Sequence, residues 1–111
     1  MHAQYSIDDA LNALGVLGNP TRRAILSDLA HRPRSVGEIA AKLPVSRPAV
    51  SKHLRILQHA KLVVYEGDGN RNIFKLHPAG FLSIRDWLDS YWEQALCNFV
   101  ALAEGERPPQ P

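Results

Sequence analysis

The sequence predicts one mainly helical domain with a single small β-hairpin, in the order α-α-α-α-β-β-α. Apolar residues recur at helical spacing along most of the chain, and capping residues and prolines divide this pattern into separate helices. One charged, glycine-bearing segment separates two short runs of strand-forming residues, which is typical of a hairpin. The length of 111 residues fits one core, so we expect a single domain over 1–104 and a disordered, proline-rich tail over 105–111.

The first two helices are expected in the first third of the chain. Ile7, Leu11 and Leu14 are spaced at helical intervals, which predicts a helix that starts at Ile7. Asn19 is a good N-cap and Pro20 a good first helical residue, so a second helix should follow and run to Pro33.

The next two helices are short and close together. Ser35 and Glu38 have the spacing of a capping box, which predicts a third helix that Pro44 interrupts. Ser46 is expected to cap a fourth helix, and two short helices joined by a turn of about four residues form a helix-turn-helix. The residues expected to form the buried stripe of the fourth helix are Val50, Leu54 and Leu57.

The apolar pattern then changes from helical to extended. Residues 62–65 and 73–76 are strand formers, and the segment 66–72 between them is charged and turn-prone. A hairpin directly after a helix-turn-helix occupies the position of a wing, so we expect a winged helix-turn-helix. His77-Pro78 should end the second strand, and helical spacing predicts a long last helix over about 79–103.

Charge is unevenly distributed along the chain. The net charge is +2, but residues 20–60 contain eight basic and two acidic side chains, whereas 78–104 contain one basic and four acidic ones. A basic middle segment suggests a surface that faces a polyanion, and the acidic end suggests a surface with another role.

Several classes of protein are not expected. The chain has no signal-peptide pattern and no apolar run long enough to cross a membrane, so we expect a cytoplasmic protein without a membrane partner. Cys97 is the only cysteine, which excludes an intrachain disulfide. The sequence contains no catalytic motif and no metal-ligand spacing, so we expect neither an enzyme nor a cofactor.

Residues 17–76 resemble the arsenic-repressor (ArsR) family of winged-helix regulators. Segment 17–26 matches the family before the motif, and 45–57 matches it most strongly, with the pattern Ser-x-Pro-x-Val-Ser-x-His-Leu-x-x-Leu. The resemblance implies a homodimeric repressor that binds a near-palindromic DNA operator. Family members release that operator when a metal or another signal arrives.

Two features depart from the family pattern. The chain has Ala60-Lys61-Leu62 where the family usually has Ala-Gly-Leu, so the fourth helix lacks the glycine that commonly takes a left-handed conformation there. Metal-sensing members carry cysteines in the first helix of the motif, or Asp, His and Glu ligands along the last helix. Segment 35–40 has no cysteine and the last helix has no histidine, so we expect no metal site and identify no inducer.

The exposed arc of the fourth helix carries side chains suited to DNA. Arg47 and Ser51 lie near its N-terminus and are the expected base readers, whereas Lys52 and Arg55 are expected to contact phosphates. His53 should either pack against the core with a bond to a backbone carbonyl or contact a phosphate. The alternative for the whole arc is the solvated face of an ordinary amphipathic helix. The predicted DNA-binding residues are Ser46, Arg47, Pro48, Ser51, Lys52, His53, Arg55, Asn70 and Arg71.

Residues outside this helix are weaker candidates. In the hairpin, Asn70 and Arg71 could enter a minor groove or follow the backbone, although Asp68 beside them would oppose phosphate. For three arginines the choice is between a phosphate contact and plain surface charge: Arg22, Arg23 and Arg34.

The last helix carries more apolar surface than one small subunit can readily bury. Trp87, Tyr91 and Trp92 fall within six positions, and aromatic enrichment beside an acidic face fits a symmetric dimer interface. Intramolecular core and a small-molecule pocket between the rings are the alternatives. Cys97 is interpreted as a small buried apolar residue rather than a redox sensor. The predicted interface residues are Ile7, Leu11, Leu14, Leu88, Tyr91, Trp92, Ala95 and Phe99.

Two other functions are weighed against that of a dimeric DNA-binding repressor. One is a winged helix that binds an acidic protein partner through its basic face, although exposed aromatic residues would be expected on that face. The other is a DNA-bound metal or redox sensor whose signal site has no recognisable sequence pattern.

Overall fold

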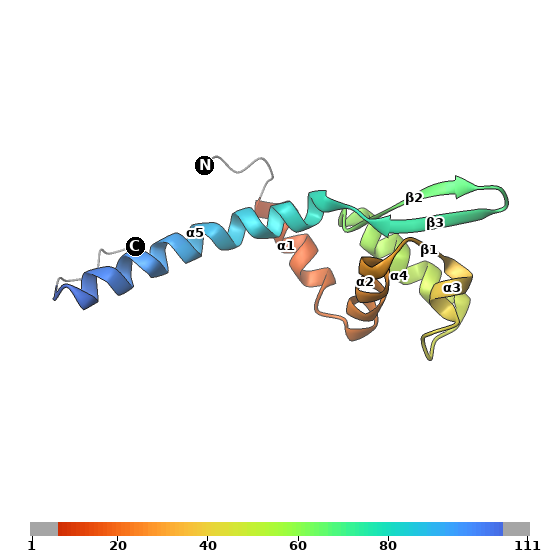
Figure 1. Cartoon of the computed structure of the whole chain (residues 1–111), viewed down its shortest axis with the longest axis horizontal. Coiled ribbons are helices and arrows are strands. Elements are labelled where there is room, and N and C mark those ends of the chain that lie inside the picture. Colours follow the sequence, from red (N-terminus) through yellow and green to blue (C-terminus); the bar gives the residue numbers. More distant parts are fainter. Residues whose placement is uncertain (1–6, 106–111) are drawn as a thin grey trace.

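Over residues 7–105, the part of the chain that the computed structural model describes, the protein has five helices and one small antiparallel sheet, whose β-hairpin projects from the helices (Figure 1). The helices of the N-terminal half are α1 (Ile7–Val16), α2 (Pro20–His31), α3 (Val36–Ala40) and α4 (Arg47–His59). The strands are β1 (Arg34–Ser35), β2 (Val63–Asp68) and β3 (Arg71–Leu76), and α5 (Pro78–Ala103) follows them. The predicted fold class and element order are confirmed, with β1 as an addition. Of the predicted tail over 105–111, residues 106–111 lie outside the described residues.

The predicted helix starts are confirmed by their hydrogen bonds. The Asn19 side chain accepts a hydrogen bond of 3.1 Å from the backbone N–H of Arg22 at the start of α2. Ser35 and Glu38 form a complete capping box at α3. The backbone N–H of Glu38 donates to the Ser35 hydroxyl at 3.2 Å, and the backbone N–H of Ser35 donates to the Glu38 carboxylate at 2.9 Å. The Ser46 hydroxyl caps α4 at 3.3 Å. These local bonds place both helices of the motif.

The strand β1 was not predicted from the sequence, and it changes the interpretation of Arg34. β1 pairs with β3, which brings Arg34 opposite Phe74 and gives the sheet order β1-β3-β2. The Arg34 side chain is only 7% exposed, and its Nε lies 2.8 Å from Oδ1 of Asp28 in α2. The interpretations of Arg34 as surface charge or as a phosphate contact are therefore wrong. It is half of a buried ion pair.

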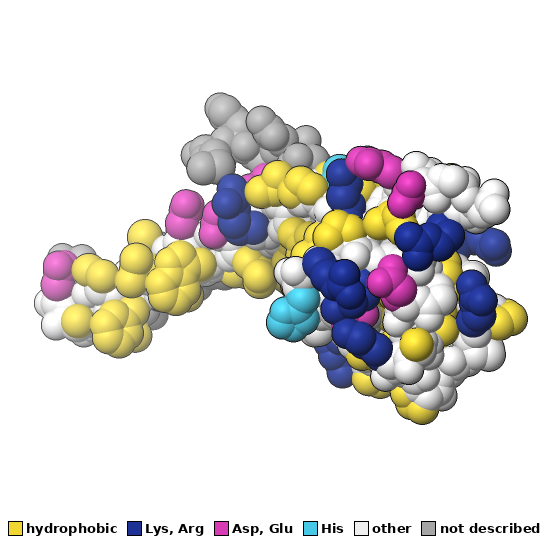
Figure 2. Space-filling view, turned by 45° about the vertical axis from the view of Figure 1, so that its right-hand side comes forward, with side chains coloured by type: hydrophobic (Ala, Val, Ile, Leu, Met, Phe, Trp, Pro, Cys, Tyr) yellow, Lys and Arg dark blue, Asp and Glu magenta, His cyan; other side chains and the backbone are white. Residues whose placement is uncertain are grey.

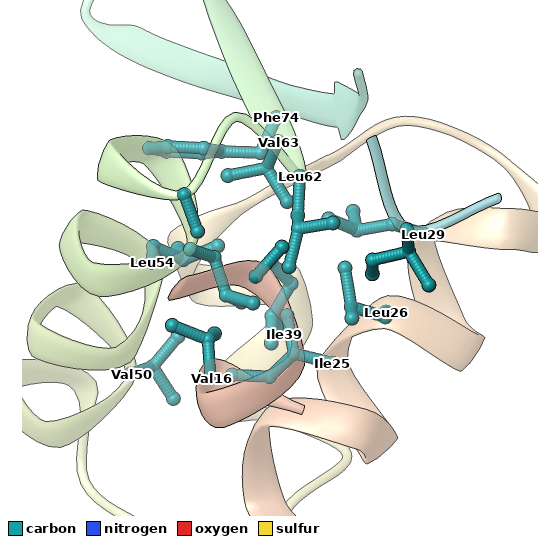
Figure 3. Packing of buried hydrophobic residues seen from close by; sticks show 14 residues of the cluster. Val16, Ile25, Leu26, Leu29, Ile39, Val50, Leu54, Leu62, Val63 and Phe74 are labelled. Carbon is teal, nitrogen blue, oxygen red and sulfur yellow. The ribbon is translucent and has the colours of Figure 1, made fainter. Parts of the chain in front are cut away.

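The core lies between the helices of the motif and the sheet. The predicted stripe of Val50, Leu54 and Leu57 is buried, which confirms the orientation of α4. Figure 3 shows Val50 and Leu54 directed towards side chains of α1, α2 and α3. The opposite face of α4 is consequently left to solvent. The largest fully buried side chains are Ile25, Ile39, Leu54, Leu57, Leu62, Val50 and Val63.

The turn after α4 is closed without the usual glycine. Lys61 has a φ of 60°, which is the left-handed conformation expected of glycine at this position. The backbone N–H of Lys61 donates a hydrogen bond to the carbonyl of Gln58, and the N–H of Leu62 donates one to the carbonyl of Leu57, both at 3.0 Å. These two hydrogen bonds form a complete Schellman motif. The hairpin therefore leaves α4 as it would from a glycine turn, at the expense of a strained lysine.

The start of α5 lies directly against this turn. The N–H of Gly80 donates to the carbonyl of Lys61 at 2.8 Å, and a Cβ at Gly80 would come within 2.5 Å of the Ala60 carbonyl oxygen. The first turns of α5 then pack against α1. The second half of α5, residues 91–103, extends away from the domain and is called the arm below (Figure 1). The molecule measures 62 × 27 × 22 Å as a result.

Most of the arm is exposed in the single chain. Cys97 is exposed as well, so the prediction that it is buried is wrong for the chain by itself. Within residues 7–105 no helix is both long and apolar enough to cross a bilayer.

Candidate nucleic-acid interface

The exposed arc of α4 presents the predicted side chains to solvent. Since its buried stripe faces the core, Arg47, Ser51 and Lys52 lie on the outer side. Figure 2 shows Lys and Arg side chains spread over the domain, and hydrophobic side chains along the arm. The view shows a cationic domain surface and a largely apolar arm, on which acidic side chains are fewer than hydrophobic ones. The residues of α4 on the exposed arc are Arg47, Pro48, Ser51, Lys52 and Arg55.

A cleft of about 430 Å³ joins α4 to the tip of the hairpin. Two basic side chains, Arg47 from α4 and Arg71 from β3, line it together with hydroxyl and amide groups. Elements far apart in sequence thus place donors around one concave surface, which a run of charge on one helix would not do. The lining residues are Ser35, Val36, Gly37, Arg47, Pro48, Ser51, Asn70, Arg71 and Asn72.

The hairpin has a two-residue turn of Gly69 and Asn70. Gly69 has a φ of 64° and is followed by a residue without positive φ, the pattern of a type II′ turn. Arg71 lies opposite Asp68 in the register, and their charged groups are 3.9 Å apart at exposed positions. An exposed ion pair at that distance contributes little free energy, so Arg71 can leave Asp68 for a stronger anion.

His53 is half-buried beside Arg22 and Lys52. Its Nδ1 is buried without a hydrogen-bond partner among the described residues, so this nitrogen does not make the predicted bond to a backbone carbonyl. Burial lowers the pKa of His53, and the positive charges of Arg22 and Lys52 lower it further. The neutral imidazole is therefore favoured in the free protein.

Comparison with known proteins identifies this arrangement. A family model described as a helix-turn-helix domain matches residues 17–66. HTH-type transcriptional regulator Rv2034 of Mycobacterium tuberculosis is 47% identical over 90 residues, which cover 81% of this chain and 84% of that protein. The crystal structure of an ArsR family transcriptional regulator superposes with a TM-score of 0.73 at 26% identity, covering 83% of this chain and 94% of that one. The chain belongs to the ArsR family of winged helix-turn-helix regulators.

The predicted family and the predicted class of function, DNA-binding transcriptional regulation, are thereby confirmed. A further structural relative is the homodimeric winged helix-turn-helix DNA-binding domain Mb0332 of Mycobacterium bovis. It has a TM-score of 0.62 at 24% identity and covers 90% of this chain and 94% of that one. That similarity supports the fold of this ArsR-family regulator over most of its length.

Arg22 and Arg23 have a structural role that the sequence reasoning missed. Nε of Arg22 donates to the carbonyl of Val16, and Nη1 of Arg23 donates to that of Leu17, both at 2.9 Å. The last carbonyls of a helix have no partner inside the helix, so these bonds attach the end of α1 to the start of α2. In the sequence, two arginines close to the end of a helix are the signal from which these hydrogen bonds could have been predicted.

The residues predicted for a dimer interface in this regulator are nearly all exposed in the single chain. Trp92 is 65% and Phe99 69% exposed, and Ile7 and Leu11 of α1 also face solvent. Leu14 differs, because it is half-buried and packs against the core of its own chain. Trp87 and Tyr91 contact each other edge to face at 5.0 Å between ring centres. Large apolar side chains that the prediction omitted extend the same exposed helix: Leu96, Val100 and Leu102.

Metal ligands do not gather anywhere in the described part of the chain. No group of three or more His, Cys, Asp or Glu side chains between residues 7 and 105 has a geometry that could hold an ion.

Proposed function

We propose that this ArsR-family protein is a homodimeric repressor that binds a near-palindromic operator through α4 and the hairpin. The observation that carries the proposal is the cleft between Arg47 and Arg71, because it joins the recognition helix and the wing into one cationic surface. A helix with an exposed polar face enters the major groove, and the adjoining wing can reach the backbone or the minor groove. We assign DNA contacts to Ser46, Arg47, Pro48, Ser51, Lys52, His53, Arg55, Asn70 and Arg71.

The dimer is proposed from the exposed apolar face of α5. Large side chains such as Trp92 and Phe99 are open to water along an arm that has little of its own domain beside it. A second copy would cover this face, and the Mycobacterium bovis relative is homodimeric. In a dimer, two recognition helices about 34–36 Å apart would read successive major grooves. We infer that the protein acts by occluding a promoter, in the cytoplasm and without catalysis.

Selection of DNA from a random library by the purified protein tests this function. The wild type should enrich a palindromic site and sediment as a dimer at the same concentration. Lys52→Ala should weaken binding to operator and random DNA alike and reduce the slope of log K against log salt by about 1. Arg47→Ala should instead blur the preference at one base position in each half-site.

Each result has a contrary outcome. No enriched sequence would contradict a role as an operator-binding repressor and favour binding of an acidic protein partner. An Arg47→Ala variant with an unchanged base preference would show that another residue reads that base. Release of DNA by near-stoichiometric zinc would instead favour the sensor alternative.

A further inference from the structure

Gly37, in the first helix of the motif, lies directly under the side chain of Arg47. A Cβ at Gly37 would be 3.2 Å from Nη2 of Arg47, 3.5 Å from its Cζ and 4.0 Å from its Nε. The three nearest atoms that such a Cβ would meet all belong to this one guanidinium group. The charged group therefore lies directly beside α3 at Gly37.

The backbone itself does not require glycine at this position. Gly37 is within α3 and has no positive φ, so an alanine could adopt the same conformation. Glycine inside a helix is less stable than alanine, because it loses more conformational freedom on folding. A residue that weakens its own helix without a backbone reason suggests a functional constraint.

Arg47 makes no ion pair with any acidic side chain of the described residues. The carboxylate nearest in sequence to Gly37 is that of Glu38, which is occupied by the N–H of Ser35 at 2.9 Å and by Arg32 at 3.7 Å. The guanidinium group thus lies beside α3, and no carboxylate of the described residues uses its N–H donors. Its place in the wall of the cleft leaves those donors to a ligand that enters the cleft.

We propose that Gly37 is a specificity-determining position, because its missing Cβ allows Arg47 to rest on α3 in the orientation that reads the operator. This inference rests on the proposed function. A free arginine side chain loses rotamer freedom when it binds, and a surface that holds it beforehand reduces that loss. A bidentate contact to guanine also needs the planar group in one orientation, so a small displacement weakens recognition.

Gly37→Ala tests the proposal, with Gly15→Ala as the matched control. Gly15 is also a helical glycine, but a Cβ there would meet nothing within 4 Å. Both variants should melt at or above the wild-type temperature, because alanine favours the helix and the end of Arg47 can move aside. Only Gly37→Ala should lose operator affinity, by about three- to tenfold, with a weaker preference at the base position that Arg47 reads.

A double-mutant cycle separates this effect from others. In an Arg47→Ala background, Gly37→Ala should have no further effect on binding, because the side chain that it displaces is gone. An equal loss in both backgrounds, an unchanged affinity and base preference, or a melting temperature below that of the wild type would each overturn the inference. If the wild type selects no operator, the proposed function fails and this inference with it. If the wild type selects one and Gly37→Ala binds it equally well, only the inference fails.

Discussion

Replacing Lys61 by glycine should stabilise the protein, because Lys61 holds a left-handed conformation with φ of 60°. That conformation costs a residue with a Cβ about 1–2 kcal/mol. Glycine avoids this strain but loses about 0.5–1 kcal/mol more conformational entropy on folding. The difference between the central values, about 1.5 and about 0.75 kcal/mol, is a net gain of about 0.75 kcal/mol. The hydrogen bonds of the turn involve only backbone atoms, so they should survive the change.

Thermal unfolding at fixed protein concentration measures this gain. A domain of this size should melt about 3–6 °C higher with Lys61→Gly, since 1 kcal/mol shifts the midpoint by about 4–8 °C. Lys61→Ala is the control, because it removes the same charge and side chain but keeps the Cβ. It should leave the midpoint close to that of the wild type. An equal rise in both variants would show that the lysine side chain, and not backbone strain, limits stability, and would refute the reasoning.

Three other changes test separate parts of the structure. Arg34→Met should lower the free energy of unfolding by up to about 3–5 kcal/mol, because Asp28 loses its buried partner and keeps only the exposed Lys42, 3.3 Å away. The salt dependence of DNA binding should not change, and a smaller slope would contradict the buried role of Arg34. The lowered pKa of His53 means that the unfolded chain binds its proton more readily, so stability should fall as the pH drops below 6.5. Melts between pH 7.5 and 5 should show a smaller fall for His53→Gln. Trp92→Asp should give a folded monomer by sedimentation with operator affinity at least about tenfold lower, whereas Ser90→Asp should remain a dimer.

Local chemistry explains why so much of the fold could be predicted from the sequence. Asn19, Ser35 and Ser46 each bond to a backbone N–H three residues ahead, so their effect is contained in a short stretch of sequence. The buried stripe of α4 follows from the helical period in the same way. These local features place the recognition helix and its outward arc without knowledge of the remaining chain.

The features that were missed depend on contacts between elements. Arg34 is six residues from Asp28 in sequence, but only the fold places it in the interior beside that carboxylate. β1 has two residues, too few to show an alternating pattern, and it exists because β3 lies beside it. The position of Cys97 was misjudged because apolar neighbours along a helix do not tell whether its own chain covers them. The cleft likewise needs the hairpin to fold back beside α4.

The path from α5 to α4 is short, because backbone hydrogen bonds join their ends directly. The N–H of His77 donates to the carbonyl of Leu62 at 2.9 Å, and the N–H of Gly80 donates to the carbonyl of Lys61 at 2.8 Å. These bonds attach the beginning of α5 to the turn that ends α4, although the whole hairpin separates them in sequence. Under the proposed function, the pairing of two α5 helices would therefore fix the separation of two α4 helices without a flexible linker. Tight joining of this kind explains why residue 80 has no side chain, since a Cβ there would collide with backbone carbonyl oxygens.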